Sequence, residues 1–199
     1  MSTETRRYEK KRRAELEAET RRRITETAVE LHGTLGPART SISAIAERAG
    51  VRRSTVYRHF PDEAALFDAC SAHWEAANPA PDMAAWQPID DPDERLQTAL
   101  EEFYAYYGRT EQMMDNLHRD ELTMPRVAER FAGYHGYIAV VRDLMMRGRS
   151  VRGRRREETR AAVGHALAYT TWRSLAREQG LTDDQAVALM CALVTGATR

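Results

Sequence analysis

Hydrogen-bond donors crowd one short segment of the sequence, residues 53–59, which reads Arg-Ser-Thr-Val-Tyr-Arg-His. An arginine can bond a guanine edge through two N–H groups, and a serine or threonine can contact a thymine methyl group or either base. Tyrosine and histidine can hydrogen-bond to phosphate oxygens. A helix this rich in donors favours entry into the major groove of DNA. We expect Arg53, Ser54 and Thr55 to read bases, and Tyr57 and His59 to contact the backbone.

A helix-turn-helix over residues 41–67 would position that segment. Gly50 permits a left-handed turn between a helix at about residues 42–49 and a second helix at about 53–60. Ala46 is small enough for another helix to cross close over it, and Val56 points inward, which leaves the polar side of the second helix exposed. The alternative is a plain helical hairpin. The expected helix caps are Ser41 or Ser43 for the first helix and Asp62 for the helix that follows.

Spaced residues in this segment resemble the DNA-binding domain of the TetR family of transcriptional regulators. The similarity is strong over about residues 20–75, and residues 165–195 resemble the last two helices of tetracycline-repressor-like C-terminal domains. The resemblance implies a homodimeric regulator that binds a palindromic operator on double-stranded DNA. The matching positions are Ile45-Ala46, Ala49-Gly50-Val51, Ser54-Thr55-Val56-Tyr57-Arg58-His59-Phe60 and Ala65-Leu66-Phe67.

The resemblance also implies phosphate contacts, with one departure from the family pattern. Ser41 and Ser43 would lie at the phosphate-facing start of the first motif helix. The family often has a lysine shortly after the aromatic residue, where a helix start meets phosphate, but Asp62-Glu63 occupies that stretch here. Either this protein does not make that phosphate contact, or Arg52, Arg58 and the basic residues at the start of the chain replace it.

Charge divides the sequence into a basic front and an acidic remainder. Residues 1–60 hold 14 Lys or Arg against 8 Asp or Glu, a balance of +6, and residues 61–199 hold 16 against 22, a balance of −6. This split suits a protein of which one part meets phosphate. The most basic stretch, residues 1–14, predicts an arm that either reaches the DNA minor groove or is a solvated extension.

Composition and motif content exclude several function classes. The sequence has no run of about 18 apolar residues that could span a membrane, and its first twenty residues are charged, unlike a signal peptide. Cys70 and Cys191 show neither metal-site nor disulfide spacing, so we expect a reducing, cytoplasmic location. No nucleophile elbow, phosphate loop or metal signature is present, so we expect no enzyme activity, no cofactor and no metal.

Helical periodicity predicts an all-α fold, with a three-helix N-terminal domain followed by a helical bundle. Four prolines between residues 78 and 92 mark a linker, which places a DNA-binding domain at 1–77 and a ligand-binding and dimerisation domain at 78–199. Thr182 is the expected cap of the last helix. The other expected helices lie at about 15–34, 92–108, 110–121, 124–147, 155–179 and 183–197.

Aromatic and methionine side chains gather in the second half, where the resemblance implies a small-molecule site. Such side chains suit an adaptable apolar cavity, although core packing explains many of them equally well. The sequence therefore predicts a repressor that an apolar or aromatic ligand releases from DNA. The alternative is a DNA-binding regulator or activator with no small-molecule effector. The candidate ligand-binding residues are Phe103, Tyr104, Tyr107, Met114, His118, Phe131, Tyr134, His135, His165, Tyr169 and Trp172.

Small and apolar stripes on the last two helices predict a two-fold, four-helix dimer interface. The alternative is that these faces are buried within one chain. The candidate interface residues are Ala161, Gly164, Ala168, Leu175, Val187, Met190, Cys191 and Val194.

Overall fold

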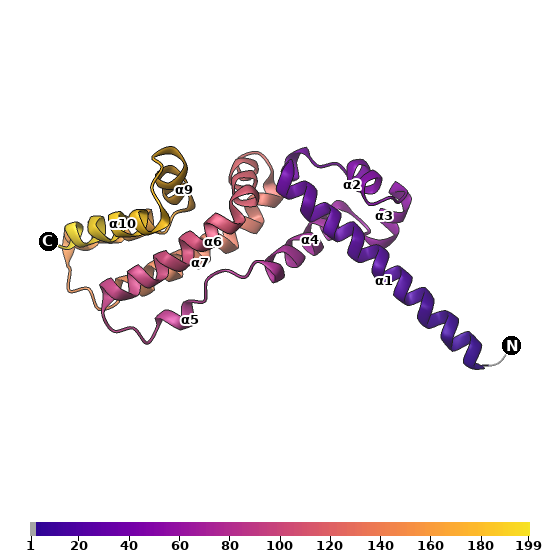
Figure 1. Cartoon of the computed structure of the whole chain (residues 1–199), viewed down its shortest axis with the longest axis horizontal. Helices are drawn as coiled ribbons and strands as arrows, with labels where there is room; N and C mark the ends of the chain where they lie inside the picture. The colour runs from indigo at the N-terminus through magenta and orange to yellow at the C-terminus, as the bar shows by residue number, and fades with distance from the viewer. Residues whose placement is uncertain (1–2) are drawn as a thin grey trace. The chain divides into compact units, whose positions relative to one another are not determined.

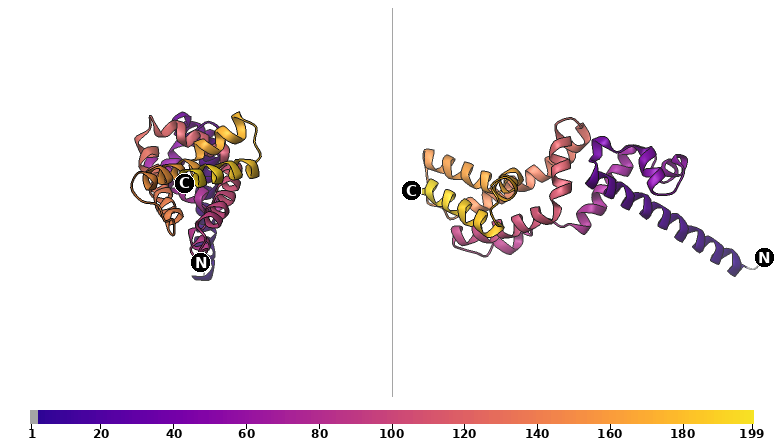
Figure 2. Two further views of the ribbon diagram at one scale, coloured as in Figure 1. Left: turned by 90° about the vertical axis from the view of Figure 1, so that its left-hand side faces the viewer. Right: turned by 45° about the horizontal axis from the view of Figure 1, so that its top comes forward.

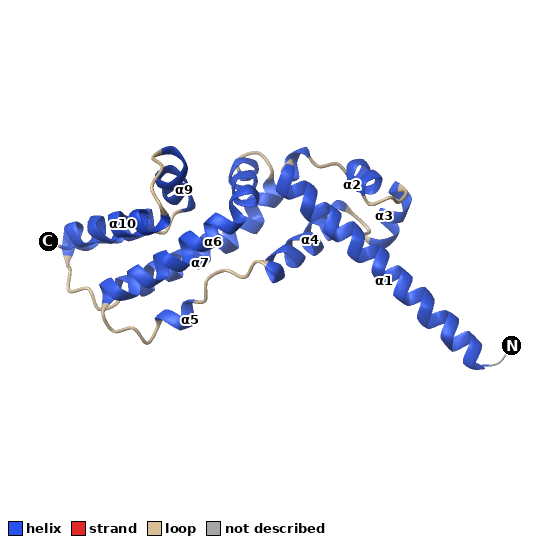
Figure 3. Ribbon diagram, in the orientation of Figure 1, coloured by secondary structure: helices blue, strands red, loops and turns tan. Residues whose placement is uncertain are grey.

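The computed structural model describes the backbone of residues 3–199 and the side chains from residue 6 onward, and over this range it contains helices and loops but no strand (Figures 1 and 3). The all-α prediction is confirmed. The elements are α1 (Thr3–Thr34), η1 (Pro37–Arg39), α2 (Ile42–Arg48), α3 (Arg53–His59), α4 (Glu63–Ala77), α5 (Met83–Trp86), α6 (Pro92–Glu121), α7 (Pro125–Met146), α8 (Gly153–Ala166), α9 (Tyr169–Arg173), the π-helix η2 (Ser174–Glu178) and α10 (Asp183–Thr198).

The chain divides into two compact units. The N-terminal unit contains the residues up to Pro79 together with Asn116–Thr123, and the C-terminal unit contains Ala80–Asp115 and Met124–Arg199. Helix α6 therefore supplies its last turns to the N-terminal unit and its longer first part to the C-terminal unit.

A small apolar core holds the N-terminal unit together. Ile24 and Ala28 of α1 pack against Ile45 of α2, Val56 of α3 and Leu66 of α4, each at most 2% exposed. Burial of a side chain of this size contributes about 1.5–3 kcal/mol. The packing fixes α3 against α1 and α2, so that the polar side of α3 faces solvent.

Local signals set the boundaries of α2, α3 and α4. The Ser41 hydroxyl accepts a hydrogen bond from Ala44 N at 3.1 Å, and the Asp62 carboxylate accepts one from Ala65 N at 2.7 Å, so both residues are N-caps. Gly50 has a φ of 65°, and the adjacent Val51 N–H donates to Ala46 O at 2.9 Å across the turn. The helix-turn-helix boundaries predicted from these residues are therefore correct to within a residue.

In the C-terminal unit, α8 packs against both α7 and α10 (Figure 2). Val163 of α8 and Val194 of α10 are fully buried, and Thr159 of α8 donates a hydrogen bond to Ala197 O at 3.2 Å. Thr182 and Gln185 form a reciprocal capping box at the start of α10, where Thr182 was the predicted cap.

Three predicted helix boundaries are wrong. Helix α1 starts at Thr3, so the stretch 1–14 is helical from there on rather than a separate arm. Helix α6 continues through Gly108, where a break was expected, because the glycine packs in the helix beside the Trp172 ring. The single helix expected over 155–179 is instead α8, α9 and η2.

Tyrosine hydroxyls account for the end of α8. Tyr104 donates to Ala166 O at 2.9 Å, and Tyr107 donates to Leu167 O at 2.6 Å. Carbonyls at a helix end have no partner within the helix, and these two phenols supply partners from α6. The sequence gives no local sign of this break, because the groups that stabilise it lie about 60 residues earlier in the chain.

Candidate nucleic-acid interface

The outward face of α3 carries the side chains that were predicted to contact DNA. Arg53, Ser54, Tyr57 and Arg58 are exposed, and Thr55 is half-buried. Val56, on the opposite side, is 1% exposed and anchors the helix in the core. One short helix thus presents a row of donors on a rigid support, which is the arrangement that major-groove reading requires.

Arg53 and Tyr57 interact across one turn of α3. An Arg53 Nη donates to the Tyr57 hydroxyl at 3.2 Å, and the guanidinium carbon lies 5.5 Å from the centre of the Tyr57 ring. The hydrogen bond to Tyr57 raises the pKa of Arg53. Both side chains are exposed, so the contact orients the guanidinium along the helix and leaves it accessible.

His59 lies at the end of α3 in a different environment. It is half-buried, and burial, together with the charges of Arg58 and Arg21, lowers its pKa below the usual 6.5. Its Nε2 atom is covered and has no hydrogen-bond partner in the part of the chain that the structure describes. A phosphate contact by this nitrogen would require rotation of the ring, so the predicted contact by His59 stays a prediction.

The remaining predicted DNA-contacting residues lie around the turn. Ser41 and Ser43 are exposed at the start of α2, and Arg52 is exposed at the N-cap position of α3. Asp62 is occupied as the cap of α4, so its carboxylate covers the helix start where the resembled family often has a lysine that meets phosphate. The negative charge at that point would repel a phosphate group. Contacts with the DNA backbone would therefore have to come from the neighbouring arginines.

Sequence reasoning missed Arg21 of α1, which contacts the end of α3. Arg21 Nη1 donates to His59 O, and its guanidinium carbon lies 4.0 Å from the centre of the Phe60 ring. Arg21 thereby holds the C-terminal end of α3 against α1. The sequence shows only a run of three arginines at 21–23, without a sign of which one is turned toward α3.

The last turns of α6 form a second feature that sequence reasoning missed. Within the N-terminal unit, Asn116 donates to Gly33 O at 2.6 Å, Arg119 donates to Leu35 O at 3.0 Å, and Asp120 accepts from Ala38 N at 2.9 Å. Asp120 is 2% exposed. These three side chains fix the connection between α1 and α2, and hence the base of the helix-turn-helix.

Most of the predicted ligand-binding residues lie in one aromatic cluster of the C-terminal unit. Phe103, Tyr107 and Trp172 are fully buried, and the Tyr107 ring lies 5.4 Å from Tyr169 and 5.9 Å from Trp172. The Tyr107 hydroxyl is also within 3.0 Å of the Tyr134 hydroxyl. Burial raises the pKa of Tyr134 to about 12 and that of Tyr107 well above its usual value, so both phenols are protonated at neutral pH.

The other candidates are distributed differently. Tyr104 and Met114 are buried, as is Phe131, which stacks on Tyr134 at 5.2 Å between ring centres. His135 and His165 are exposed, and His118 belongs to the Asn116–Thr123 segment of the N-terminal unit. The structure therefore brings the aromatic candidates together, and the exposed His135 ring packs on Phe131 and Tyr134 at their edge, 5.5 and 5.6 Å between ring centres.

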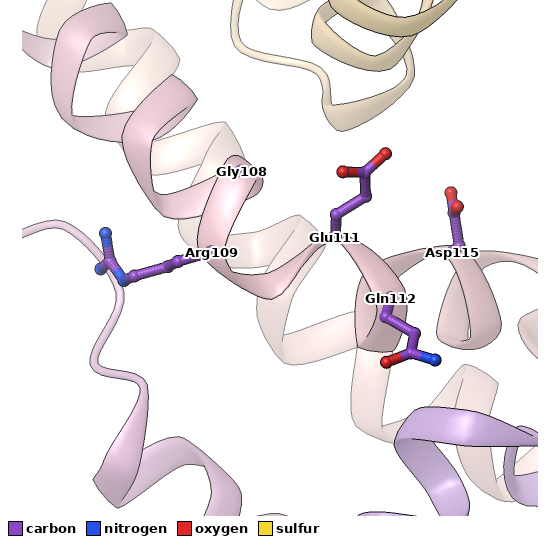
Figure 4. Close-up of a pocket in the computed structure, with 5 residues that line it drawn as sticks. All are labelled: Gly108, Arg109, Glu111, Gln112 and Asp115. Atoms are coloured by element: carbon purple, nitrogen blue, oxygen red, sulfur yellow. The ribbon is translucent and has the colours of Figure 1, made fainter.

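A hollow of about 390 Å³ lies on α6 in the C-terminal unit and is lined by Gly108, Arg109, Glu111, Gln112 and Asp115 (Figure 4). Arg177 Nε donates to both carboxylate oxygens of Glu111 at 2.9 Å, and Asp115 forms an ion pair with Arg173 at 2.8 Å. The lining is polar and its carboxylates are already paired, so this hollow does not suit an apolar ligand.

The candidate interface residues divide between the inside and outside of the C-terminal unit. Val187, Met190 and Val194 are at most 5% exposed, so this stripe of α10 packs on its own chain. The outward side of α10 carries Leu189 and Leu193 instead, at 46% and 44% exposure. Of the remaining candidates, Ala161 is exposed, and four are half-buried: Gly164, Ala168, Leu175 and Cys191.

Among the described residues, no group of three or more His, Cys, Asp or Glu side chains is placed to hold a metal ion. Over the same part of the chain, no helix has the length and apolar character needed to cross a bilayer.

Residues 24–70 match the family described as bacterial regulatory proteins, tetR family. No curated protein matches the chain by sequence. Among solved structures, a TetR-like transcriptional regulator from Rhodococcus sp. RHA1 is 22% identical, with a TM-score of 0.62 over 88% of this chain and 93% of that chain.

Two further structures show the same likeness. A putative fatty acid metabolism regulator from Clostridium perfringens is 15% identical, with a TM-score of 0.59 over 87% of this chain and 97% of that chain. The multidrug binding protein EbrR, in complex with imidazole, is 19% identical, with a TM-score of 0.52 over 88% of this chain and 89% of that chain. At these identities the likeness establishes the fold.

Proposed function

We propose that this chain, whose residues 24–70 match the tetR family of bacterial regulatory proteins, is a DNA-binding transcriptional regulator, and that it acts as a cytoplasmic, homodimeric repressor that a small apolar or aromatic ligand releases from a palindromic operator. The observation that carries the DNA-binding half is the outer face of α3. There, exposed Arg53, Ser54 and Tyr57 stand on a helix that Val56 anchors in the core.

Base reading by Arg53 is tested with DNA that the protein itself selects. The wild-type chain is used to enrich a 40-base-pair duplex from a random library, and affinities for this duplex and a scrambled duplex are compared. One good bidentate contact gives about 1–3 kcal/mol of discrimination, so Arg53→Ala should reduce the specificity ratio roughly 5- to 150-fold for each half-site that the dimer contacts.

Arg154→Ala is the matched control for that experiment. Arg154 is an exposed arginine on α8 of the C-terminal unit, paired with Glu158 at 2.6 Å, so its loss removes one positive charge without touching α3. The control should keep the wild-type specificity ratio. If Arg53→Ala also keeps it, Arg53 does not read bases.

A dimer would place two copies of α3 on successive major-groove faces, about 34–36 Å apart. We place the interface on the outward side of α10, around Leu189 and Leu193, with exposed Ala161 of α8 as a close-approach position. Two α8–α10 pairs would then form a four-helix interface about a two-fold axis. The sequence-predicted candidates Gly164, Ala168, Leu175 and Cys191 are half-buried and remain part of the proposal.

Effector release is the second half of the proposal, and the aromatic cluster supports it. Stacked rings with a few polar tips are the lining that apolar and aromatic ligands favour. Tyr134 is only half-buried, so a ligand that separates the Tyr107 and Tyr134 hydroxyls has a route into the cluster. Two proteins of similar fold are described as a multidrug binding protein and a putative fatty acid metabolism regulator.

The release step is a population shift. A ligand that binds the released conformation about 100-fold more tightly supplies about 2.7 kcal/mol per site. Helix α6 carries Tyr107 in the cluster and Asp120 at the α1–α2 connection, so a shift at one end reaches the base of the helix-turn-helix. A thermal-shift screen of apolar and aromatic compounds, followed by release of the selected duplex, tests this half.

The outcomes separate the proposal from its alternative. A compound that raises the melting temperature and lowers DNA affinity supports effector-controlled repression. If the protein binds its duplex but no compound changes either quantity, the alternative holds, a DNA-binding regulator or activator without a small-molecule effector.

A further inference from the structure

Helix α1 is much longer than the part of it that packs in the N-terminal unit. Its side chains are exposed from Arg6 through Glu19, and the first fully buried one is Ile24, where the family match also begins. Both views in which α1 lies across the page show it running on past α2 and α3 (Figures 1 and 2). We call residues 6–21 of α1 the extension.

The basic side chains of the extension continue the buried face of α1. Steps of three or four residues keep to one side of a helix. Counting back from the core residues Ala28 and Ile24 in such steps reaches a set of positions that are mostly basic. These positions are Arg21, Glu17, Arg13, Lys10 and Arg6.

Arg21 shows which way this face is turned. It donates to His59 O and lies over the Phe60 ring, and both residues are at the C-terminal end of the recognition helix. The face that carries Arg6, Lys10 and Arg13 is therefore turned to the same side of α1 as α3. The charges of the extension therefore lie on the side of α1 that packs against α3.

The charges on this face are available to a partner. Arg6 and Lys10 form no ion pair with any other residue in the described part of the chain. Arg13 pairs with Glu17 at 3.2 Å, but both side chains are more than half exposed, and such surface pairs contribute little. The same face carries no large apolar residue before Ile24, so it lacks the apolar seam that a coiled coil requires.

We propose that the extension lies along the duplex and that Arg6, Lys10 and Arg13 contact its phosphates. This inference rests on the proposed DNA-binding function and adds a site outside the helix-turn-helix. A helix is about 10–12 Å wide, and the minor groove is about 6 Å wide, so a helical extension binds the sugar-phosphate backbone instead of entering that groove. From Arg6 to Arg21 the helix rises about 22 Å, which is the length of roughly six base pairs.

The extension also supplies the phosphate contacts that Asp62 and Glu63 disfavour at the start of α4. Its arginine and lysine side chains are long, exposed and fixed in spacing by the helix. Each phosphate neutralised by such a side chain releases counterions, so the extension should appear in the salt dependence of DNA binding.

The test measures the affinity for the selected 40-base-pair duplex as a function of salt concentration. The face variant combines Arg6→Ala, Lys10→Ala and Arg13→Ala. The matched control combines Arg7→Ala, Lys11→Ala and Arg12→Ala, which removes the same three charges from the other sides of the extension. All six positions are exposed, so circular dichroism and melting should be unchanged for both variants.

The slope of log K against log salt should fall by about 0.9 for each phosphate that the variant no longer neutralises. The face variant should therefore have a shallower slope by about 2–3 per subunit, while the control keeps the wild-type slope. Equal slopes in all three proteins, or an equal fall in both variants, would overturn the inference. If the wild-type chain enriches no duplex, the proposed function fails and the extension proposal fails with it.

Discussion

Gly36, between α1 and η1, is the residue whose replacement tests the role of the α6 turns most directly. Its φ of 95° and ψ of 153° lie in a region that side-chain-bearing residues rarely adopt. A Cβ there would come within 2.6 Å of Asp120 Oδ2 and closer still to Arg119 Nη2. Gly36→Ala should therefore strain the backbone and also separate the α6 side chains from the α1–α2 connection.

The two effects have different sizes. The backbone conformation alone costs a non-glycine residue about 1–3 kcal/mol. Displacement of Asp120 breaks its hydrogen bond with Ala38 N, and a hydrogen bond to a charged group contributes about 1.5–3 kcal/mol. The total loss expected for Gly36→Ala is about 2.5–6 kcal/mol. Gly50→Ala is the control, because Gly50 has a φ of 65° but a Cβ there would meet no atom within 4 Å. It should cost only about 1–2 kcal/mol.

Native-state hydrogen exchange followed by mass spectrometry is the appropriate assay, because it reports on the N-terminal unit separately. Peptides from residues 24–70 should lose more protection in Gly36→Ala than in Gly50→Ala, by a margin equivalent to the Asp120 hydrogen bond, about 1.5–3 kcal/mol. If the two variants lose equal protection, the contacts made by Arg119 and Asp120 do not stabilise this unit, and the reasoning about the α6 turns is wrong.

Three further predictions concern the cores and the dimer. Burial lowers the pKa of His32 from 6.5 to about 4, so His32 stays neutral in the folded state while the unfolded chain gains a proton below pH 6.5. The free energy of unfolding should therefore fall by up to about 3 kcal/mol between pH 6.5 and 4. Urea titrations of His32→Gln should show a smaller fall. Tyr107→Phe leaves the Leu167 carbonyl without its partner and should cost about 1–3 kcal/mol, measured by thermal unfolding; an unchanged melting temperature would contradict the role given to this hydroxyl. Leu189→Lys with Leu193→Lys should give a monomer in sedimentation equilibrium, whereas a dimer of the double variant would place the interface elsewhere.

The helix-turn-helix could be predicted from sequence because short-range chemistry determines it. Ser41 and Asp62 each cap a helix through their own side chain, and Gly50 is the residue that the turn requires. Each signal lies within a few residues of the structure it specifies. The exposed face of α3 follows from the burial of Val56 and Phe60, so most of its donors were assigned correctly as surface residues.

The C-terminal unit could be predicted less well because distant contacts override its local signals. Gly108 is a common sign of a helix break, but here it lies inside the continuous helix α6, beside the Trp172 ring. The actual break after Ala166 depends on two phenols from α6. On α10, two apolar stripes share one helix, and the sequence does not distinguish the buried stripe with Val187 from the outward one.

The continuity of α6 changes what an effector would have to do. A break at Gly108 would have made a flexible joint between the aromatic cluster and the turns that hold the α1–α2 connection. In the structure, Tyr107 and Asp120 are on one unbroken helix, at positions about 20 Å apart along its axis. If a ligand separates Tyr107 from Tyr134 as proposed, the continuous helix offers no break at Gly108 that would absorb the movement of α6 before Asp120. The Asp120 carboxylate holds Ala38 N, so the base of the helix-turn-helix responds to the same displacement.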